Sequence, residues 1–178
     1  MNNLNYIPNN ADVLFVGLNP TPLAVREQAL FNNDRSLWNI LECAGVISNS
    51  GKIPASIMYS LLISGQIDSS FRIGIADLLP HVQEQHAKDV VVSSVYVKTL
   101  LHEAVQKKVK RMGLMGEKVI TAFKREFPEL NFRSVRDAEN FMGEIILEGH
   151  SIALYSLPFP NNNNVANKHF YYKNLIEN

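Results

Sequence analysis

The chain has 178 residues, of which 46% are hydrophobic and 19% are charged, proportions typical of one ordinary globular domain. Basic and acidic residues are equal in number. No general basic field therefore attracts a nucleic-acid backbone, although a local basic patch remains compatible with this balance. Cys43 is the only cysteine, which excludes an intramolecular disulfide and a cysteine-based zinc site. The helical pattern around Cys43 predicts a small buried side chain.

Residues 1–11 are polar and rich in asparagine, so we expect a loosely docked arm on a single domain that spans residues 1–178. The arm lacks the basic start and the long apolar run of a signal peptide. No segment carries the roughly 18 consecutive apolar residues that span a bilayer. We therefore expect a cytoplasmic monomer without a membrane partner.

Short apolar runs alternate with helical patterns in the first half of the chain. Residues 13–17, VLFVG, are rich in strand-forming residues, which indicates a strand covered on both faces. Helical periodicity follows over 35–45, where we expect Trp38 to pack in the core, and again over 54–63, where Pro54 suits a first helical position. FRIGIADLLP, at 71–80, predicts the second strand and its exit loop.

The same alternation continues to the end of the chain. A long amphipathic helix is expected within 90–110, and the short strand RMGLMG leads directly into the helix GEKVITAFKREF. Residues 143–148 and 151–157 predict a hairpin that leads into a fourth core strand. A final helix follows the run of asparagines. This order predicts an α/β sandwich with a mostly parallel sheet.

Three unusual segments follow predicted strands: GLNPTP, ADLLP and LPFPNNNN. In an open α/β sheet, ligands bind beyond the carboxyl ends of the strands. We therefore expect the three segments to meet and to form a site.

Three side chains, two of them in these segments, suit a binding site. Asn19 has an uncharged donor and an acceptor between two stiffening prolines, so it could hold a water molecule, or it could cap its own turn. Phe31 could stack on a flat heterocycle, or it could be a core residue at a helix end. Asp77 could accept hydrogen bonds from a ligand, or it could cap the next loop.

Other motifs limit the classes of reaction and ligand that this sequence supports. Lys168 and Lys173 lie near the asparagine run and are candidates for phosphate contacts, whereas the basic residues of 107–111 suit the solvated end of a helix. The sequence has no nucleophile elbow, no phosphate-binding loop and no dinucleotide fingerprint. What remains is chemistry with a positioned water and a polarised leaving group, and no cofactor.

Over nearly its whole length, the chain resembles the uracil-DNA glycosylase superfamily. VLFVGLNPTP resembles the first motif of the mismatch-specific and single-strand-selective branches. ALFNNDRSLWNILECAG and LMGEKVITAF resemble two segments of the mismatch-specific branch. LPFPNNNNVANKHF resembles the second motif of the single-strand-selective branch.

The resemblance implies a three-layer α/β/α sandwich around a four-stranded, mainly parallel sheet. It also implies a base excision repair enzyme that binds DNA, flips a damaged base out of the helix and hydrolyses its N-glycosidic bond without a metal. Flipping is least costly for mismatched or damaged bases. The site must then orient water, stabilise a cationic sugar and accept negative charge on the departing base.

The resemblance also assigns roles to individual residues. Asn19 is implied to position the attacking water and Phe31 to stack on the base. The remaining base-binding residues are implied to be Gly17, Leu18, Pro20, Thr21 and Asp77. The DNA-binding residues are implied to be Pro158, Phe159, Pro160, Asn161, Asn162, Asn163, Asn164 and Lys168.

Four features depart from the superfamily. Thr21 replaces the glycine that usually follows Asn-Pro, so its Cβ is expected to reshape the pocket. Leu157 stands where some branches carry an electrophilic histidine, and an asparagine stands at the position of the intercalating wedge. Asp77 stands where the single-strand-selective branch has an asparagine that binds the amide edge of uracil. An ionised Asp77 would favour amino groups, as in a cytosine-type edge, whereas a protonated Asp77 would still accept uracil.

Two functions follow from these observations. The first is a monofunctional glycosylase for a deaminated or mismatched, uracil-like base, because no lysine occupies a motif position for Schiff-base chemistry. The alternative is a weak or inactive protein of the same fold that binds nucleic acid or a small ligand.

Overall fold

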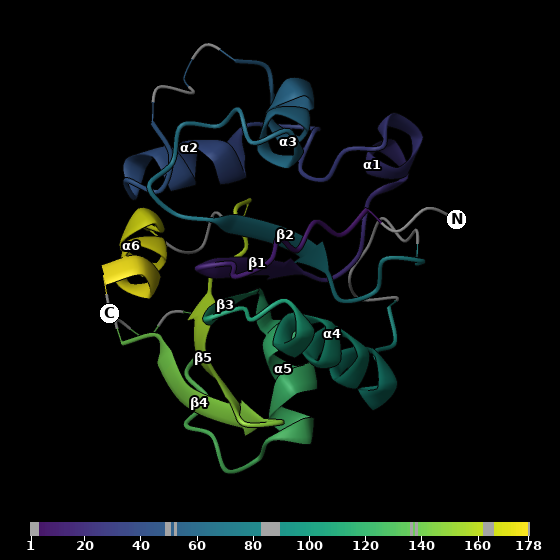
Figure 1. Cartoon of the computed structure of the whole chain (residues 1–178), viewed down its shortest axis with the longest axis vertical. Helices are drawn as coiled ribbons and strands as arrows, with labels where there is room; N and C mark the ends of the chain where they lie inside the picture. The colour runs from purple at the N-terminus through teal and green to yellow at the C-terminus, as the bar shows by residue number, and fades with distance from the viewer. Residues whose placement is uncertain are drawn as a thin grey trace.

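The computed structural model describes residues 4–48, 51, 53–82, 90–135, 137, 139–161 and 166–177. Within these residues, the chain is an α/β protein with five strands in one mostly parallel sheet and six helices around it (Figure 1). The strands are β1 (Val13–Gly17), β2 (Ile73–Asp77), β3 (Arg111–Met115), β4 (Phe141–Leu147) and β5 (His150–Leu157). The helices are α1 (Pro22–Glu27), α2 (Ser36–Cys43), α3 (Ala55–Ile63), α4 (Ser94–Gln106), α5 (Glu117–Glu126) and α6 (His169–Glu177).

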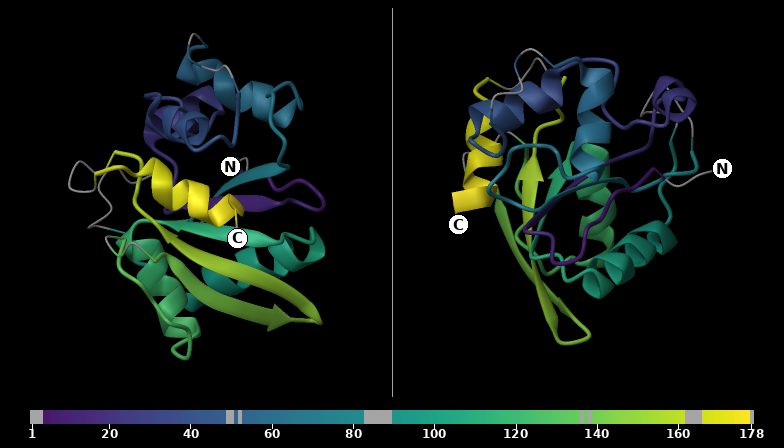
Figure 2. Two further views of the ribbon diagram at one scale, coloured as in Figure 1. Left: turned by 90° about the vertical axis from the view of Figure 1, so that its left-hand side faces the viewer. Right: turned by 45° about the horizontal axis from the view of Figure 1, so that its top comes forward.

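The strand order is β2-β1-β3-β5-β4. The β1–β2, β1–β3 and β3–β5 pairs are parallel, and β4 pairs antiparallel with β5 at the edge of the sheet. The expected hairpin is therefore confirmed, but the predicted number of four strands is wrong, because its first strand joins the same sheet as a fifth member. Figure 2 shows the hairpin extending to a tip far from α2 and α3.

Helices cover both faces of the sheet. Alternate side chains of β1 point in opposite directions, and all five of its residues are buried. Leu14 and Val16 belong to the core under α4 and α5, whereas Val13 and Phe15 belong to the core under α2, α3 and α6. The strand is thus covered on both sides, as its continuous apolar run predicts.

The expected helices are present, with two corrections between β1 and β2. Helix α1 was not predicted; it begins after Thr21, whose Oγ1 accepts a hydrogen bond from Ala24 N at 3.1 Å. Trp38 is fully buried in α2, as predicted, but Cys43 at the end of α2 is exposed rather than buried. The buried face of α2 ends with Leu41, and Cys43 lies off that face.

The amino-terminal segment is docked, not loose, from residue 4 onward. Leu4 and Ile7 are buried, and Tyr6 forms a backbone bridge with Ile75 of β2. Asn5 bonds through its side chain to both backbone polar groups of Asp77. The Asn5 side chain satisfies backbone groups of the edge strand β2, which helps to explain why a polar segment packs closely.

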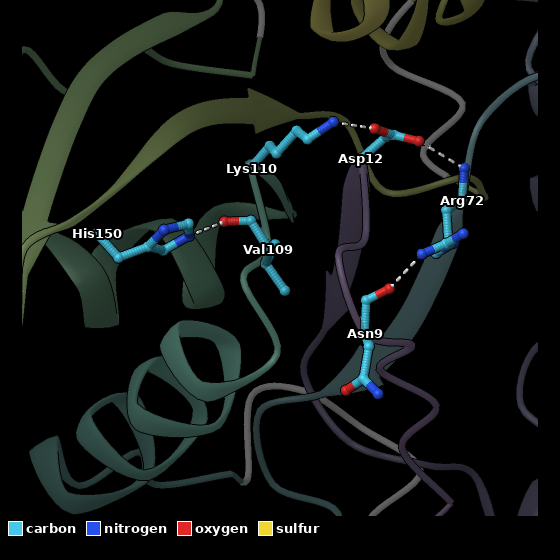
Figure 3. Close-up of polar contacts among 6 residues, drawn as sticks. All are labelled: Asn9, Asp12, Arg72, Val109, Lys110 and His150. Atoms are coloured by element: carbon cyan, nitrogen blue, oxygen red, sulfur yellow. Dashed lines mark hydrogen bonds and ion pairs between the residues drawn. The ribbon is translucent and has the colours of Figure 1, made fainter.

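Polar contacts hold the amino ends of the strands together (Figure 3). Asp12 accepts from Lys110 Nζ at 2.7 Å and from the backbone N–H of Arg72 at 2.8 Å. His150 Nε2 lies 2.7 Å from the carbonyl oxygen of Val109. Burial opposes ionisation of Asp12, but its bonds to Lys110 and Arg72 prevail and lower its pKa.

None of the helices in the described ranges is both long and apolar enough to cross a membrane.

Candidate functional site

A cavity of about 880 Å³ opens at the carboxyl edge of the sheet. Its wall is formed by residues 18–24 after β1, by Leu30, Phe31, Asn33 and Asp34 before α2, by Asp77 at the end of β2, by residues 115–119 at the turn from β3 into α5, and by 159–161 after β5. In the sheet, β2 lies on one side of β1 and β3 lies on the other. The cavity therefore lies at the point where the strand order reverses. Such a point is the usual ligand site of an open α/β sheet.

Asn19 lines the cavity from the first loop and is half-buried. Its Nδ2 donates to the carbonyl oxygen of Pro20 at 3.2 Å, so the side chain also braces its own turn. The structure therefore confirms that Asn19 braces its own turn, whereas its binding of a water molecule stays a prediction. The adjacent backbone is fixed by bonds from Leu78 N to Gly17 O at 2.9 Å and from Leu79 N to Leu18 O at 2.8 Å.

Thr21 contributes to the wall and caps α1 at the same time. Its φ of −71° is accessible to every residue, so the loop needs no glycine here. The Thr21 side chain instead serves as the N-cap of helix α1, which follows the loop.

Phe31 lies beside this loop with a half-buried ring that lines the cavity. Its φ of +53° is unfavourable for a bulky residue. Trp38 Nε1 donates to the Phe31 carbonyl at 3.0 Å and helps to hold this conformation. The Phe31 and Phe159 rings are 6.2 Å apart between centroids, so two aromatic side chains from distant segments meet at the opening.

Asp77 ends β2 and is only 4% exposed. A Cβ atom at Gly17 would overlap Oδ1 of Asp77 and would lie 3.4 Å from Cζ of Phe31. Gly17 therefore allows the carboxyl group and the aromatic ring to approach the same part of the wall. Burial raises the pKa of Asp77 to about 7.

Asp34 is a second carboxyl group in the same wall, and its pKa moves in the opposite direction. Burial opposes ionisation, but hydrogen bonds from Ser36 and Asn161 outweigh it and lower the pKa of Asp34. At neutral pH, Asp34 is thus ionised while Asp77 titrates.

The segment after β5 is anchored at several points. Tyr172 Oη donates to the carbonyl oxygen of Pro158 at 2.9 Å, and Lys168 Nζ donates to that of Pro160 at 2.6 Å. Asn161 Nδ2 donates to Asp34 Oδ2 at 2.8 Å and joins this segment to the Phe31 side of the cavity. Lys168 thus braces the segment. Asn162, Asn163 and Asn164 lie outside the described residues.

Leu157 is fully buried in the core shared by α2, α3 and α6. Its side chain packs beside Gly113 of β3, where a Cβ atom would overlap Leu157 Cδ1. Leu157 does not belong to the cavity wall among the described residues.

Comparison with protein-family models gave no match for this sequence, and comparison with curated proteins found no similar protein.

Several residues of the site, among them Asp34, Asn5 and Lys118, were not predicted from the sequence. Asn5 holds the backbone of Asp77, and Lys118 lines the cavity while its Nζ donates to the carbonyl oxygen of Val90 at 2.9 Å. The GEK turn after β3 was a signal for Lys118, because a strand that leads directly into a helix places that turn at the carboxyl edge. Asn5 had no comparable signal. Among the described residues, no group of three or more potential side-chain ligands is arranged to hold a metal ion.

Proposed function

We propose that this chain is a monofunctional DNA glycosylase related to the uracil-DNA glycosylase superfamily, and that it removes a deaminated or mismatched base. The observation that carries the proposal is the convergence of Asn19, Phe31 and Asp77 on one cavity, with Phe159 and Asn161 at its opening. These residues are separated by up to 142 positions in the sequence, so their meeting depends on the fold. The superfamily's three-layer α/β/α arrangement is part of the same proposal and is supported by helices on both sheet faces.

The cavity offers the groups that hydrolysis of an N-glycosidic bond requires without an enzyme nucleophile. The Asn19 side chain supplies an uncharged acceptor and donor that can orient a water molecule. The Phe31 ring provides a surface for stacking on a flipped base. Helix α5 begins beside the cavity with no side-chain cap at Gly116, so its first N–H groups favour negative charge that develops on the departing base.

DNA is the proposed partner, and the opening of the cavity is the proposed contact surface. Phe159 is 38% exposed there, between Pro158 and Pro160, which are both buried. Lys168 and Tyr172 hold this segment in place from α6 and the turn before it. A braced segment with an exposed aromatic tip suits insertion beside an unstacked base.

The second candidate is a protein that binds nucleic acid or a small ligand in this cavity without cleaving it. The burial of Leu157 favours this candidate, because the last position of β5 supplies no electrophilic side chain to the cavity. Such a protein would show salt-sensitive binding to DNA without base release.

A panel of oligonucleotides separates the two candidates. Each carries one deaminated base, in single-stranded form or opposite each natural base, and strand cleavage after alkali reports base release. A glycosylase leaves at least one member of the panel alkali-labile. Retention of every base together with salt-sensitive binding would favour the second candidate, and absence of both would contradict both proposals.

A further inference from the structure

A second cavity, of about 640 Å³, lies on the side of the sheet that carries α6. Its wall includes the first residues of β3, the outer face of the hairpin β4–β5 and Asn174 of α6. Figure 2 shows the hairpin extending beyond α6, the yellow helix. Among the described residues, this wall has no member in common with the cavity that contains Asn19. A volume of this size is within the roughly 300–1,000 Å³ of small-molecule sites.

A small residue between two charged ones leaves room for this cavity. Ala153 of β5 pairs with Arg111 of β3 on one side and with Glu144 of β4 on the other. Residues paired across strands project from the same face, so the three side chains lie in one row. Two strand spacings, roughly 9–10 Å, separate the backbones of the two charged residues. The methyl group of Ala153 fills little of the space between them.

Arg111 supplies a cation to this space. Within the described part of the chain, its guanidinium group has no hydrogen bond and no ion pair, whereas the neighbouring Lys110 bonds to Asp12 at 2.7 Å. Glu144 accepts from Ser151 Oγ at 2.7 Å instead of pairing with Arg111. A guanidinium group presents a fork of donors that matches a carboxylate or a phosphate. Arg111 therefore suits an anionic ligand.

Tyr155 adds a hydroxyl donor beside Arg111. The residue lines the cavity and is only 3% exposed, yet its hydroxyl has no hydrogen bond to any described residue. Burial raises the pKa of Tyr155 against the opposing charge of Arg111, so the hydroxyl keeps its proton at neutral pH. The charge of Arg111 reaches the Tyr155 phenol, so the two donors can share one anion.

Asn140 adds an acceptor to the same wall. Its Nδ2 donates to the carbonyl oxygens of Ser156 at 3.2 Å and of Tyr171 at 2.9 Å, which fixes the amide group. Its Oδ1 has no partner among the described residues, although Asn140 is only 2% exposed. Buried polar groups are nearly always hydrogen-bonded, so an N–H group of a bound molecule is the expected partner.

Phe141 provides an apolar surface next to these polar groups. It is 39% exposed, and its ring is tilted against the Tyr155 ring at a centroid distance of 5.2 Å. A flat ring of a ligand can pack against the exposed part of Phe141.

We propose that this cavity binds a small carboxylic acid that also carries a flat ring and an N–H group. Arg111 and Tyr155 bind the carboxylate, Asn140 accepts from the N–H, and Phe141 contacts the ring. Glu139 and Glu144 in the same wall repel a second negative charge, which favours a carboxylate over a doubly charged phosphate. The site goes beyond the proposed function and does not depend on it, because the two cavities have separate walls.

Hippurate (N-benzoylglycine) is the probe, because it combines a phenyl ring, an amide N–H and a carboxylate. Nitrogen-15 NMR of the full-length protein at about pH 7.5, where the carboxylate is ionised, measures its Kd. Three analogues each change one group: hippuramide lacks the charge, N-benzoylsarcosine lacks the N–H, and benzamidomethylphosphonate carries a second negative charge. We expect a Kd for hippurate of about a millimolar or tighter, and about tenfold weaker binding of each analogue.

Two substitutions test the proposed contacts. Arg111→Gln should weaken hippurate binding about ten- to hundredfold, because it removes a charged donor. Tyr155→Phe keeps the ring and removes only the hydroxyl, so it should weaken binding about three- to tenfold. Arg125→Gln is the control for loss of a positive charge, because Arg125 is exposed in α5 and lies outside this wall; it should bind as the wild type does.

Saturable shifts at the cavity residues of β3, β4 and β5 that Arg111→Gln weakens, while Arg125→Gln does not, would support the proposed site. The absence of saturable shifts, or shifts centred on the cavity that contains Asn19, would overturn it. Equal affinities of the wild type and Arg111→Gln would also overturn it. Tighter binding of the phosphonate than of hippurate would overturn the assignment of a carboxylate ligand.

Discussion

Replacing Asp77 by asparagine is expected to stabilise the protein at neutral and alkaline pH. Burial raises the pKa of Asp77 from its ordinary value of 3.8 to about 7, and unfolding restores the ordinary value. Between these values, the folded state retains a proton that the unfolded state has lost, so the free energy of unfolding falls as pH rises. The contribution is fully present below the unfolded pKa and is lost above the folded pKa, a total of roughly 4 kcal/mol at about 1.4 kcal/mol per pKa unit.

Urea unfolding measures this effect directly. The free energy of unfolding of Asp77→Asn, relative to the wild type, should increase by roughly 3 kcal/mol between about pH 5 and about pH 8. Asp12→Asn is the matched control, because the pKa of Asp12 is lowered and its contribution disappears only in acid. Its difference from the wild type should stay constant over the same range. A constant difference for Asp77→Asn as well would refute the assignment of a neutral, buried carboxyl group.

Substitutions at three further positions, Gly17, Phe31 and Tyr172, test the geometry of the cavity by urea unfolding. Gly17→Ala should lower the free energy of unfolding by about 1–3 kcal/mol, because the new Cβ atom overlaps the carboxyl group of Asp77 in the neighbouring strand β2. Gly51→Ala is the control, because its Cβ atom meets only ordinary van der Waals contacts and should leave the stability nearly unchanged. At Phe31, where φ is +53°, glycine should be more stable than alanine by about 1 kcal/mol, because only glycine adopts this conformation without strain. Tyr172→Phe should cost about 1–3 kcal/mol, because it leaves the buried carbonyl of Pro158 without its donor.

Phe170, which lies in helix α6, provides the control for the Phe31 variants. The glycine and alanine variants of Phe170, an exposed residue of α6, should rank in the opposite order, with alanine more stable by about 1 kcal/mol. The same order at Phe31 as at Phe170 would argue against a left-handed Phe31. Equal losses for Gly17→Ala and Gly51→Ala would argue against close packing of Asp77 on β1. An unchanged stability of Tyr172→Phe would show that the anchor of the segment after β5 is dispensable.

Much of the fold could be predicted, because local patterns coincide with the tertiary environment. The VLFVG run is apolar at every position, and β1 is covered on both faces. Helix α1 was missed because Asn-Pro-Thr-Pro is typical of a turn, although Thr21 is also a helix cap with proline next to it. The strand count was wrong because the resemblance implies four strands, whereas the first strand of the hairpin, β4, also pairs with β5 in the same sheet.

The candidate site could be predicted in outline from a single rule of topology. Segments that follow parallel strands meet at one edge, and this brings Asn19, Phe31 and Asp77 to one cavity. The hydrogen bonds that hold these residues could not be predicted, because the bonds between Asn5 and Asp77, for example, join residues 72 positions apart. The protonation of Asp77 depends on its burial, which only the assembled structure defines.

The most direct test of the proposed function is single-turnover base release by Asn19→Ala, measured beside the wild type and Asn9→Ala. Asn9 is exposed at the amino ends of the strands, and its bond to Arg72 uses only its backbone carbonyl (Figure 3). We predict that the wild type and Asn9→Ala release a deaminated base at equal rates. Asn19→Ala should be slower by about one to several orders of magnitude, with about 1.4 kcal/mol lost per factor of ten. Release by Asn19→Ala at the wild-type rate, or no release by the wild type, would contradict the account.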